Sequence, residues 1–486
     1  MERLTGADAT FLYGETRRTP MEVANCIVIG TAGMPSGEGL LRVFHDHLES
    51  RLHLAPLLRR RLVRVPFELT HPLWIDDPDF DLGYHLRHLA LPHPGTLDQL
   101  GDVVARLLSR PLDHTRPLWE LYLIEGLTDG RAAVFMKTHH AAIDGVAGFE
   151  LLSTLIDLSP DAPPPEPPAT PWVPDREPTD LELVLGAGAD LVRQPVRAFK
   201  AARRLVTGAV RLQRRGASPA AALGATSAPR TPFNVQATAH RSLRFAELDF
   251  GEIRAVKEAA GVKVNDVVLA VIGGGLRRYL QRRDELPDRS LMAFVPVTLR
   301  TDGSQGANLT SVMYVELGTD EPDPRLRLMR VVASAGDAKA AHAEMGPPAI
   351  IDLTELTGPA LGALTGRLVA ATRFNERTRL GGNVVVSNIP GVDVPLYASG
   401  ASIERIFPIG PITDGTGLNI TMLSYCGRLN VAVMGDRAAV PDPGVVAADI
   451  RDAHDELRRA VLSDRPARPR KRSSKAGKGY AHGRRR

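Results

Sequence analysis

Apolar and polar positions alternate along the chain with two periods, and together they predict a mixed α/β protein. Apolar residues at helical spacing predict amphipathic helices over residues 38–52 and 97–108, and a short apolar run predicts a strand over Val23–Ile29. The second half repeats this mixture, with helices expected at 266–282, 324–342, 361–374 and 447–462 and strands at 291–297, 311–317, 384–387, 405–409, 418–425 and 428–435. Because the two halves mix sheet and helix at similar size, we expect two related α/β sandwich lobes.

A predicted hairpin is the most informative local pattern. Strands are expected over Trp119–Glu125 and Ala132–Thr138, joined at Thr128-Asp129-Gly130, because Asp-Gly readily takes the positive φ of a tight turn. The return strand ends in the pair His139-His140, and helical spacing of apolar residues resumes after Gly145. The end of a rigid strand is a place where catalytic geometry can be fixed.

Two imidazoles and a carboxylate therefore lie close together in the sequence, at His139, His140 and Asp144. Histidine titrates near neutral pH, so His140 is a candidate general base. The residues alone leave open that Asp144 caps the following helix and that His139 is a buried core histidine. We predict no metal, because adjacent histidines point in different directions and no other cluster supplies the missing ligands.

The length and composition indicate a multidomain globular protein. The 486 residues exceed one ordinary domain, and the two cysteines, Cys26 and Cys426, form no disulfide framework, which favours a reducing compartment. No apolar run reaches the ~20 residues that span a bilayer, and residues 1–8 show no basic segment leading into an apolar one. We expect a cytoplasmic protein whose contact with a membrane or lipid droplet is peripheral.

Charge and proline content suggest the domain organisation. Residues 159–179 are rich in proline, and 181–215 predict a helix, broken near Pro195, whose second half is basic and amphipathic. This helix either packs on the body or lies on a lipid surface. We expect boundaries at 1–158 for a first lobe, 159–240 for a crossover and bridge, 241–463 for a second lobe and 464–486 for a disordered tail.

The tail distorts the overall charge. Residues 465–486 carry ten Lys or Arg and no acid, and removing them takes the formal net charge from +4 to −6. Such a tail is either solvated or attracted to anionic lipid headgroups. Nucleic-acid binding is not expected, because the body has no accompanying basic face. The chain also has no Gly-x-Ser-x-Gly elbow and no Walker loop, which argues against a serine hydrolase or an NTPase.

Several motifs together resemble one family. The stretch from His139 to Gly145 is similar to the His-His-x-x-x-Asp-Gly signature of the bacterial wax ester synthase/acyl-CoA:diacylglycerol acyltransferases. Other matching blocks, in order along the chain, are Phe11-Leu12 with Pro20-Met21, Pro117-Leu118-Trp119, Asn265-Asp266, Pro296–Arg300 and Asn383–Gly391. The resemblance spans residues 4–463. It departs from the family pattern at Glu22, where a His is usual, and at Ala307, which separates Gly306 from Asn308.

The resemblance implies a fold and an activity. The fold would be that of chloramphenicol acetyltransferase and of condensation domains, two sandwich lobes that flank a central channel. The activity would be transfer of a long-chain acyl group from acyl-CoA, a co-substrate, to diacylglycerol or a fatty alcohol, with His140 as general base and no further cofactor. The alternatives are a non-catalytic or weakly active lipid-binding relative, and an acyltransferase of this fold with another acceptor.

It also implies roles for individual residues. Asp144 would organise the site by pairing with Arg300, and His139 would support either His140 or the channel wall. Further site-organising residues would be Gly145, Asn265 and Asp266. Substrate-binding residues would be Pro117, Leu118, Trp119 and Asn308.

Overall fold

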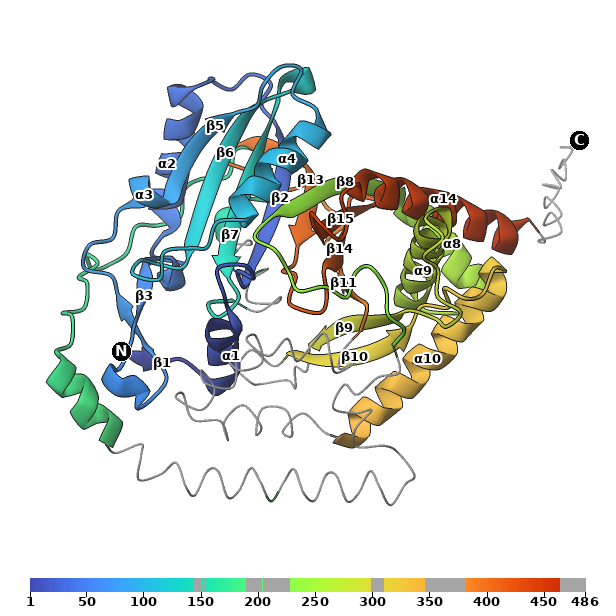
Figure 1. Ribbon diagram of the computed structural model, residues 1–486. Helices are drawn as coiled ribbons and strands as arrows, with labels where there is room; N and C mark the ends of the chain where they lie inside the picture. The colour runs from blue at the N-terminus through green and yellow to red at the C-terminus, as the bar shows by residue number, and fades with distance from the viewer. Residues whose placement is uncertain are drawn as a thin grey trace, which may run out of the picture.

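Two six-stranded sheets organise the chain into two lobes (Figure 1). The computed structural model describes residues 1–143, 148, 151, 154–188, 203, 228–298, 310–345 and 382–463. The first lobe holds most of the N-terminal half. The second lies beside it and carries the long helices near the C-terminal end of the described chain.

The first sheet surrounds the strand that ends in the histidine pair. Its strands, in sheet order, are β12 (Tyr397–Ala398), β13 (Ala401–Ile409), β2 (Glu22–Gly30), β7 (Arg131–His139), β6 (Trp119–Leu127) and β5 (Leu86–Ala90). Helices α2 (Glu38–Arg51) and α4 (Leu97–Leu108) belong to this lobe, and α4 begins with a capping box between Thr96 and Gln99. β7 lies inside the sheet, so its backbone is hydrogen-bonded on both sides.

Shorter elements complete the first lobe. They are β1 (Glu2–Arg3), α1 (Gly6–Gly14), η1 (Pro56–Arg59), β3 (Arg60–Val63), η2 (Pro66–Glu68), β4 (Leu73–Asp76), α3 (Leu82–His85) and η3 (Thr128–Gly130). β1, β4 and β3 form a small three-stranded sheet.

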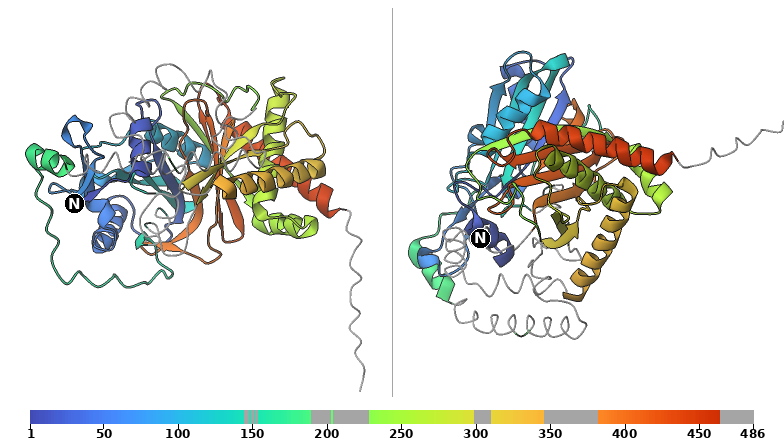
Figure 2. Two further views of the ribbon diagram at one scale, coloured as in Figure 1. Left: turned by 90° about the horizontal axis from the view of Figure 1, so that it is seen from below. Right: turned by 45° about the vertical axis from the view of Figure 1, so that its right-hand side comes forward.

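The second sheet is covered by helices that share one large core. Its strands, in sheet order, are β10 (Thr310–Glu316), β9 (Met292–Thr298), β11 (Val384–Ile389), β14 (Leu418–Tyr425), β15 (Arg428–Asp436) and β8 (Arg241–Asp249). The helices are α8 (Phe250–Ala260), α9 (Val264–Arg282), α10 (Pro324–Met345) and α14 (Pro443–Leu462), and α9, α10 and α14 pack together beside the sheet (Figure 2).

Glycines allow α9 to pack closely against its neighbours in the core. A Cβ on Gly273 would lie 2.1 Å from the backbone oxygen of Leu317, and one on Gly275 would lie 2.8 Å from Ile450 on α14. The run Gly273-Gly274-Gly275 therefore allows α9 to pack closely against the Leu317 backbone and α14.

A third core joins the lobes. Leu100 and Val104 of α4 pack with Leu243 and Phe245 of β8, and Phe407 of β13 belongs to the same cluster. A Cβ on Gly101 would lie 2.6 Å from the backbone oxygen of Leu243, so α4 approaches β8 closely. The lobes thus meet through packed apolar side chains.

Most predicted elements within the described residues are confirmed, including the hairpin, where Asp129 and Gly130 take φ values of 63° and 65°. Two helices begin earlier than predicted, and one of them is α14, which begins at Pro443 and not at residue 447. The other is α9, which begins at Val264 and not after Asn265, because the Asp266 carboxylate accepts the backbone N–H of Lys263 at 3.1 Å and so caps the helix two residues earlier. The predicted helix at 361–374 lies outside the described residues, as does most of the bridge helix, of which residues 180–188 are helical.

One strand pairing could not be predicted from the hydrophobic periodicity. β12 and β13 come from the sequence range expected for the second lobe, yet β13 pairs with β2 and β12 pairs with β13, so both extend the first sheet. In the described part of the chain, no single helix is long and apolar enough to cross a membrane. Only α8 and α9 taken together, bent by 108°, pass that test, and α9 is largely buried in the second core.

Candidate active site

β7 delivers the two histidines to the edge of the first lobe. In its antiparallel register with β2, His139 lies opposite Glu22. The His139 N–H donates to the Leu118 carbonyl at 3.0 Å, and the Ala142 N–H donates to the His139 carbonyl at 2.9 Å, so the chain turns directly after the strand. His139 is fully buried, whereas His140, at the start of the turn, is half-buried.

His140 is held by its backbone and by its ring. Its N–H donates to the Met21 carbonyl at 2.7 Å. The imidazole stacks on the Phe11 ring with centroids 4.0 Å apart and planes 4° from parallel. Phe11 belongs to α1, so this short helix covers one face of the predicted base.

His139 lies close to two further polar side chains, Glu15 and the half-buried His114, and the three form a trio. Its Nδ1 accepts the Ala141 N–H at 3.0 Å, which assigns the proton of the neutral ring to Nε2. That Nε2 lies 3.5 Å from Glu15 Oε2, and His114 Nε2 lies 2.8 Å from the same oxygen. Burial alone would raise the pKa of Glu15, but the hydrogen bonds from His114 and His139 outweigh it and lower this pKa to about 2.

The trio has the side-chain types of a metal site. The ligand atoms of Glu15, His114 and His139 lie within 4.8 Å of one another. A metal at His139 would need the Nε2 lone pair, but the Ala141 N–H already occupies Nδ1 and leaves the proton on Nε2. The geometry therefore fits a carboxylate that accepts from two imidazoles, and the absence of a metal stays a prediction.

A group of buried ionisable residues lies next to the histidines on β7 and on the neighbouring strands β2 and β6. Lys137 is 1% exposed and donates to the Arg110 carbonyl at 2.7 Å. Its Nζ lies 3.3 Å from Glu120 and 3.6 Å from Glu22. Burial raises the pKa of Glu22 to about 8 although Lys137 opposes the shift, and the Leu112 N–H donates to Glu22 Oε1 at 2.8 Å.

The residues of the Pro-Leu-Trp block are buried and make structural contacts. Leu118 and Trp119 are each 2% exposed, and Pro117 is buried as well. The Trp119 indole donates to the Leu58 carbonyl at 2.8 Å, and the His85 ring stacks on it at 4.5 Å. Leu118 reaches the site through its carbonyl, which fixes His139. A substrate-binding role for the three remains a prediction.

The other predicted site residues divide between the second lobe and the part of the chain outside the description. Asn265 is half-buried in the first turn of α9, and the buried Asp266 is used as the helix cap. Asp144, Gly145, Arg300 and Asn308 lie outside the described residues. Their roles, including the pairing of Asp144 with Arg300, stay predictions.

Sequence reasoning missed Glu15 and His114 as site residues. Glu15 is the C-cap of α1, and His114 lies in the loop before the Pro-Leu-Trp block. Neither has a local pattern that indicates proximity to His139. The one indication that His114 belongs to the site was its position shortly before the Pro-Leu-Trp block, which resembles the family pattern.

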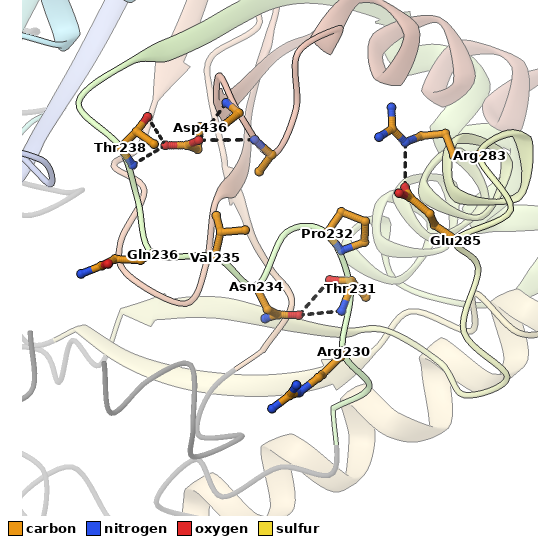
Figure 3. A pocket seen from close by; sticks show the side chains of 12 residues that line it. Arg230, Thr231, Pro232, Asn234, Val235, Gln236, Thr238, Arg283, Glu285 and Asp436 are labelled. Carbon is orange, nitrogen blue, oxygen red and sulfur yellow. Dashed lines mark hydrogen bonds and ion pairs between the residues drawn. The ribbon is translucent and has the colours of Figure 1, made fainter. Parts of the chain in front are cut away.

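A cavity of about 820 Å³ lies in the second lobe. Figure 3 shows Thr238 bonded to Asp436 on one side and the Arg283–Glu285 ion pair on the other. The strap that lines it, residues 230–238, leads to Arg241, whose guanidinium donates to the Arg18 carbonyl in the first lobe. His140 does not line this cavity, so we do not place the chemistry there.

The two-lobed arrangement defines the class of protein. The first condensation domain of the CDA synthetase superposes with a TM-score of 0.54 at 16% identity, over 95% of this chain and 97% of that one. At that identity the match shows the fold alone. The fold is that of the condensation domains and of chloramphenicol acetyltransferase.

Closer relatives define the family. Residues 4–268 match the wax ester synthase/diacylglycerol acyltransferase catalytic domain, and residues 306–458 match the C-terminal domain of the same family. A Mycobacterium tuberculosis protein assigned as a diacylglycerol O-acyltransferase is 34% identical over 94% of this chain and 90% of its own length. The structure of the wax ester synthase/diacylglycerol acyltransferase from Marinobacter aquaeolei VT8 superposes with a TM-score of 0.67 at 29% identity, over 94% of this chain and 98% of that one.

The chain therefore belongs to the wax ester synthase/diacylglycerol acyltransferase family, and it is an acyltransferase.

Proposed function

We propose that the protein transfers a long-chain acyl group from acyl-CoA to the hydroxyl of diacylglycerol, forming triacylglycerol, and that fatty alcohols are further acceptors. The observation that supports this proposal is the way in which the structure holds His140. It follows a buried strand, its N–H is held by Met21, and its ring is stacked on Phe11. The sequences of its relatives support the choice of acceptors.

In the proposed reaction, His140 removes the proton of the acceptor hydroxyl as the oxygen attacks the thioester carbonyl. A tetrahedral oxyanion forms and collapses, the C–S bond breaks, and the imidazolium returns its proton to the departing CoA thiolate. The products are an ester and free CoA, and no acyl-enzyme is needed. Binding both long-chain substrates between the lobes would supply much of the rate through proximity.

The test follows free thiol when the protein is given palmitoyl-CoA with dioleoylglycerol or with hexadecanol. We expect thiol release to depend on the acceptor and His140→Ala to lower it by ~100-fold or more. Equal release by both proteins would remove His140 as the base. No release by the wild type with either acceptor would favour the weakly active lipid-binding relative.

Peripheral contact of a cytoplasmic protein with a membrane or lipid droplet is the second part of the proposal. Leu181 and Leu185 are 67% and 69% exposed, while Leu183 on the same helical segment is buried against the small sheet. An exposed apolar face of this kind suits the surface on which diacylglycerol is dissolved. Flotation with phosphatidylcholine vesicles containing diacylglycerol tests it, because Leu181→Ser/Leu185→Ser should reduce the bound fraction and Leu326→Ser, on α10, should not.

A further inference from the structure

We propose that Glu15 is a positioning residue that holds the turn carrying His140, and that Phe11, one helical turn earlier on α1, sets the plane of the His140 ring. The inference rests on the proposed role of His140 as base. It adds two residues that act on the reaction through that histidine.

One carboxylate oxygen of Glu15 holds the segment before the site. Glu15 Oε1 accepts the Met21 N–H at 3.3 Å, and the Met21 carbonyl accepts the His140 N–H at 2.7 Å. A single residue therefore links the carboxylate to the backbone of His140. Because the Met21 peptide lies between two fixed groups, movement of Glu15 would move the His140 backbone with it.

The other oxygen holds the residue before His140. Glu15 Oε2 accepts from His114 at 2.8 Å and lies 3.5 Å from His139 Nε2. His139 in turn accepts the Ala141 N–H through Nδ1 at 3.0 Å. The His139 imidazole therefore restrains the backbone on both sides of His140. With Nδ1 accepting a hydrogen bond, its proton is on Nε2, which faces the acceptor oxygen of Glu15.

The surroundings make this carboxylate a firm anchor. The Glu15 side chain is 8% exposed, so water competes little for its oxygens. The hydrogen bonds from the two histidines lower its pKa to about 2, so it is ionised at any working pH. Other ionisable groups around the trio are Glu22 on β2, Lys137 on β7 and Glu120 on β6, and Lys137 interacts with both carboxyl groups.

Phe11 completes the arrangement from the same helix. Residues four apart lie on one face of a helix, so Phe11 and the C-cap Glu15 both reach the histidine pair from α1. The parallel stack at 4.0 Å leaves the His140 ring little freedom to tilt. The two contacts restrain both the backbone and the side chain of the base.

The experiment compares kcat and KM for Glu15→Gln, Glu15→Asp and Phe11→Leu with palmitoyl-CoA and hexadecanol. Glu15→Gln keeps the size of the side chain but replaces one acceptor oxygen with a donor, so it loses one side of the anchor. We expect kcat to fall by ~10- to 100-fold while both KM values stay within about threefold, since the substrate contacts are unchanged. Glu15→Asp, which keeps the charge, should lose less, and so should Phe11→Leu, which keeps an apolar contact. Glu49→Gln, on the exposed face of α2, is the matched control and should behave as wild type.

A second acceptor separates positioning from folding. A thiol ionises more easily than an alcohol and needs less help from a base. Hexadecanethiol should therefore show a smaller loss than hexadecanol in Glu15→Gln, with kcat expressed per folded protein from circular dichroism. An equal loss for both acceptors, or a folded Glu15→Gln with a kcat within twofold of wild type, would overturn the inference.

The two proposals fail in distinguishable ways. If His140→Ala keeps the wild-type rate, the base assignment is lost. If His140→Ala is inactive and Glu15→Gln is fully active, the base stands and only the positioning role of Glu15 is wrong.

Discussion

Glu22 on β2 lies directly opposite His139 on β7 in the antiparallel register, and both side chains are buried. A carboxyl group therefore sits beside the histidine pair at the position where the family pattern has a His. Its pKa of about 8, raised chiefly by burial, leaves it largely protonated at neutral pH. A neutral Glu22 repels the nearby carboxylates of Glu15 and Glu120 less than a charged one would. Glu22 in place of the usual His therefore destabilises the fold less than an ionised carboxylate at this position would.

Glu22 should make stability depend on pH. Its pKa is higher in the folded protein than the ordinary value of 4.5, so the folded state binds the extra proton. The stabilisation is complete below about pH 4.5 and is lost as the pH rises through about 8, by ~1.4 kcal/mol for each unit of pKa shift. Thermal melts between pH 5 and 9 should show this decline in the wild type relative to Glu22→Gln. A constant difference between the two proteins across that range would contradict the prediction, and Glu49→Gln is the control.

Lys137 should be needed for folding stability. Replacing it with Met leaves Glu120 with only the half-buried Arg87 as a cation and removes a donor to the Arg110 carbonyl. We expect Lys137→Met to lower the free energy of unfolding by ~3–5 kcal/mol in urea titrations. Adding Glu120→Gln should recover part of this loss, because the carboxylate that has lost its ammonium partner is removed. A loss below ~1 kcal/mol would mean that the ammonium contributes little.

Alanine substitutions at two glycines of the second lobe should change the free energy of unfolding in opposite directions. At Gly273 a Cβ would meet the Leu317 backbone oxygen at 2.1 Å, so the helix or the strand must move, and we expect ~2 kcal/mol or more of destabilisation. At Gly336 on α10 a Cβ meets nothing within 4 Å, and Gly336→Ala should stabilise by ~0.5–1 kcal/mol through helix propensity. Chemical denaturation of the pair measures both. Equal effects of the two substitutions would refute the close-contact interpretation.

Trp172 should fasten the proline-rich crossover to the first lobe. Its ring lies 4.7 Å from the Arg59 guanidinium, and its indole N–H donates to Asp76 at 3.3 Å. We expect Trp172→Ala to speed tryptic cleavage after Arg176 by several-fold, measured from the masses of the fragments. Val173→Ala changes a side chain that is 78% exposed and should leave the cleavage rate unchanged. If both variants are cut at the wild-type rate, Trp172 is not an anchor.

Local patterns anticipated the core of the candidate site. The apolar runs in β6 and β7 and the Asp129-Gly130 turn depend on neighbouring residues, so they could be predicted without the fold, and they placed His139 and His140 at a strand end. The resemblance then pointed to acyl transfer. The structure adds no test of Asp144, Gly145, Arg300 or Asn308, and their roles stay predictions.

The sequence by itself determined the elements and the position of the histidine pair, because hydrophobic period, turn chemistry and motif spacing are local properties. Only the tertiary structure decided what surrounds that pair. Glu15, His114 and His139 are distant along the chain and meet because α1 and the loop before β6 fold against the end of β7. The ionisation of Glu22 was equally hidden, since burial depends on neighbours that the rest of the fold supplies. The extension of the first sheet by β13 is likewise a long-range pairing that no local pattern encodes.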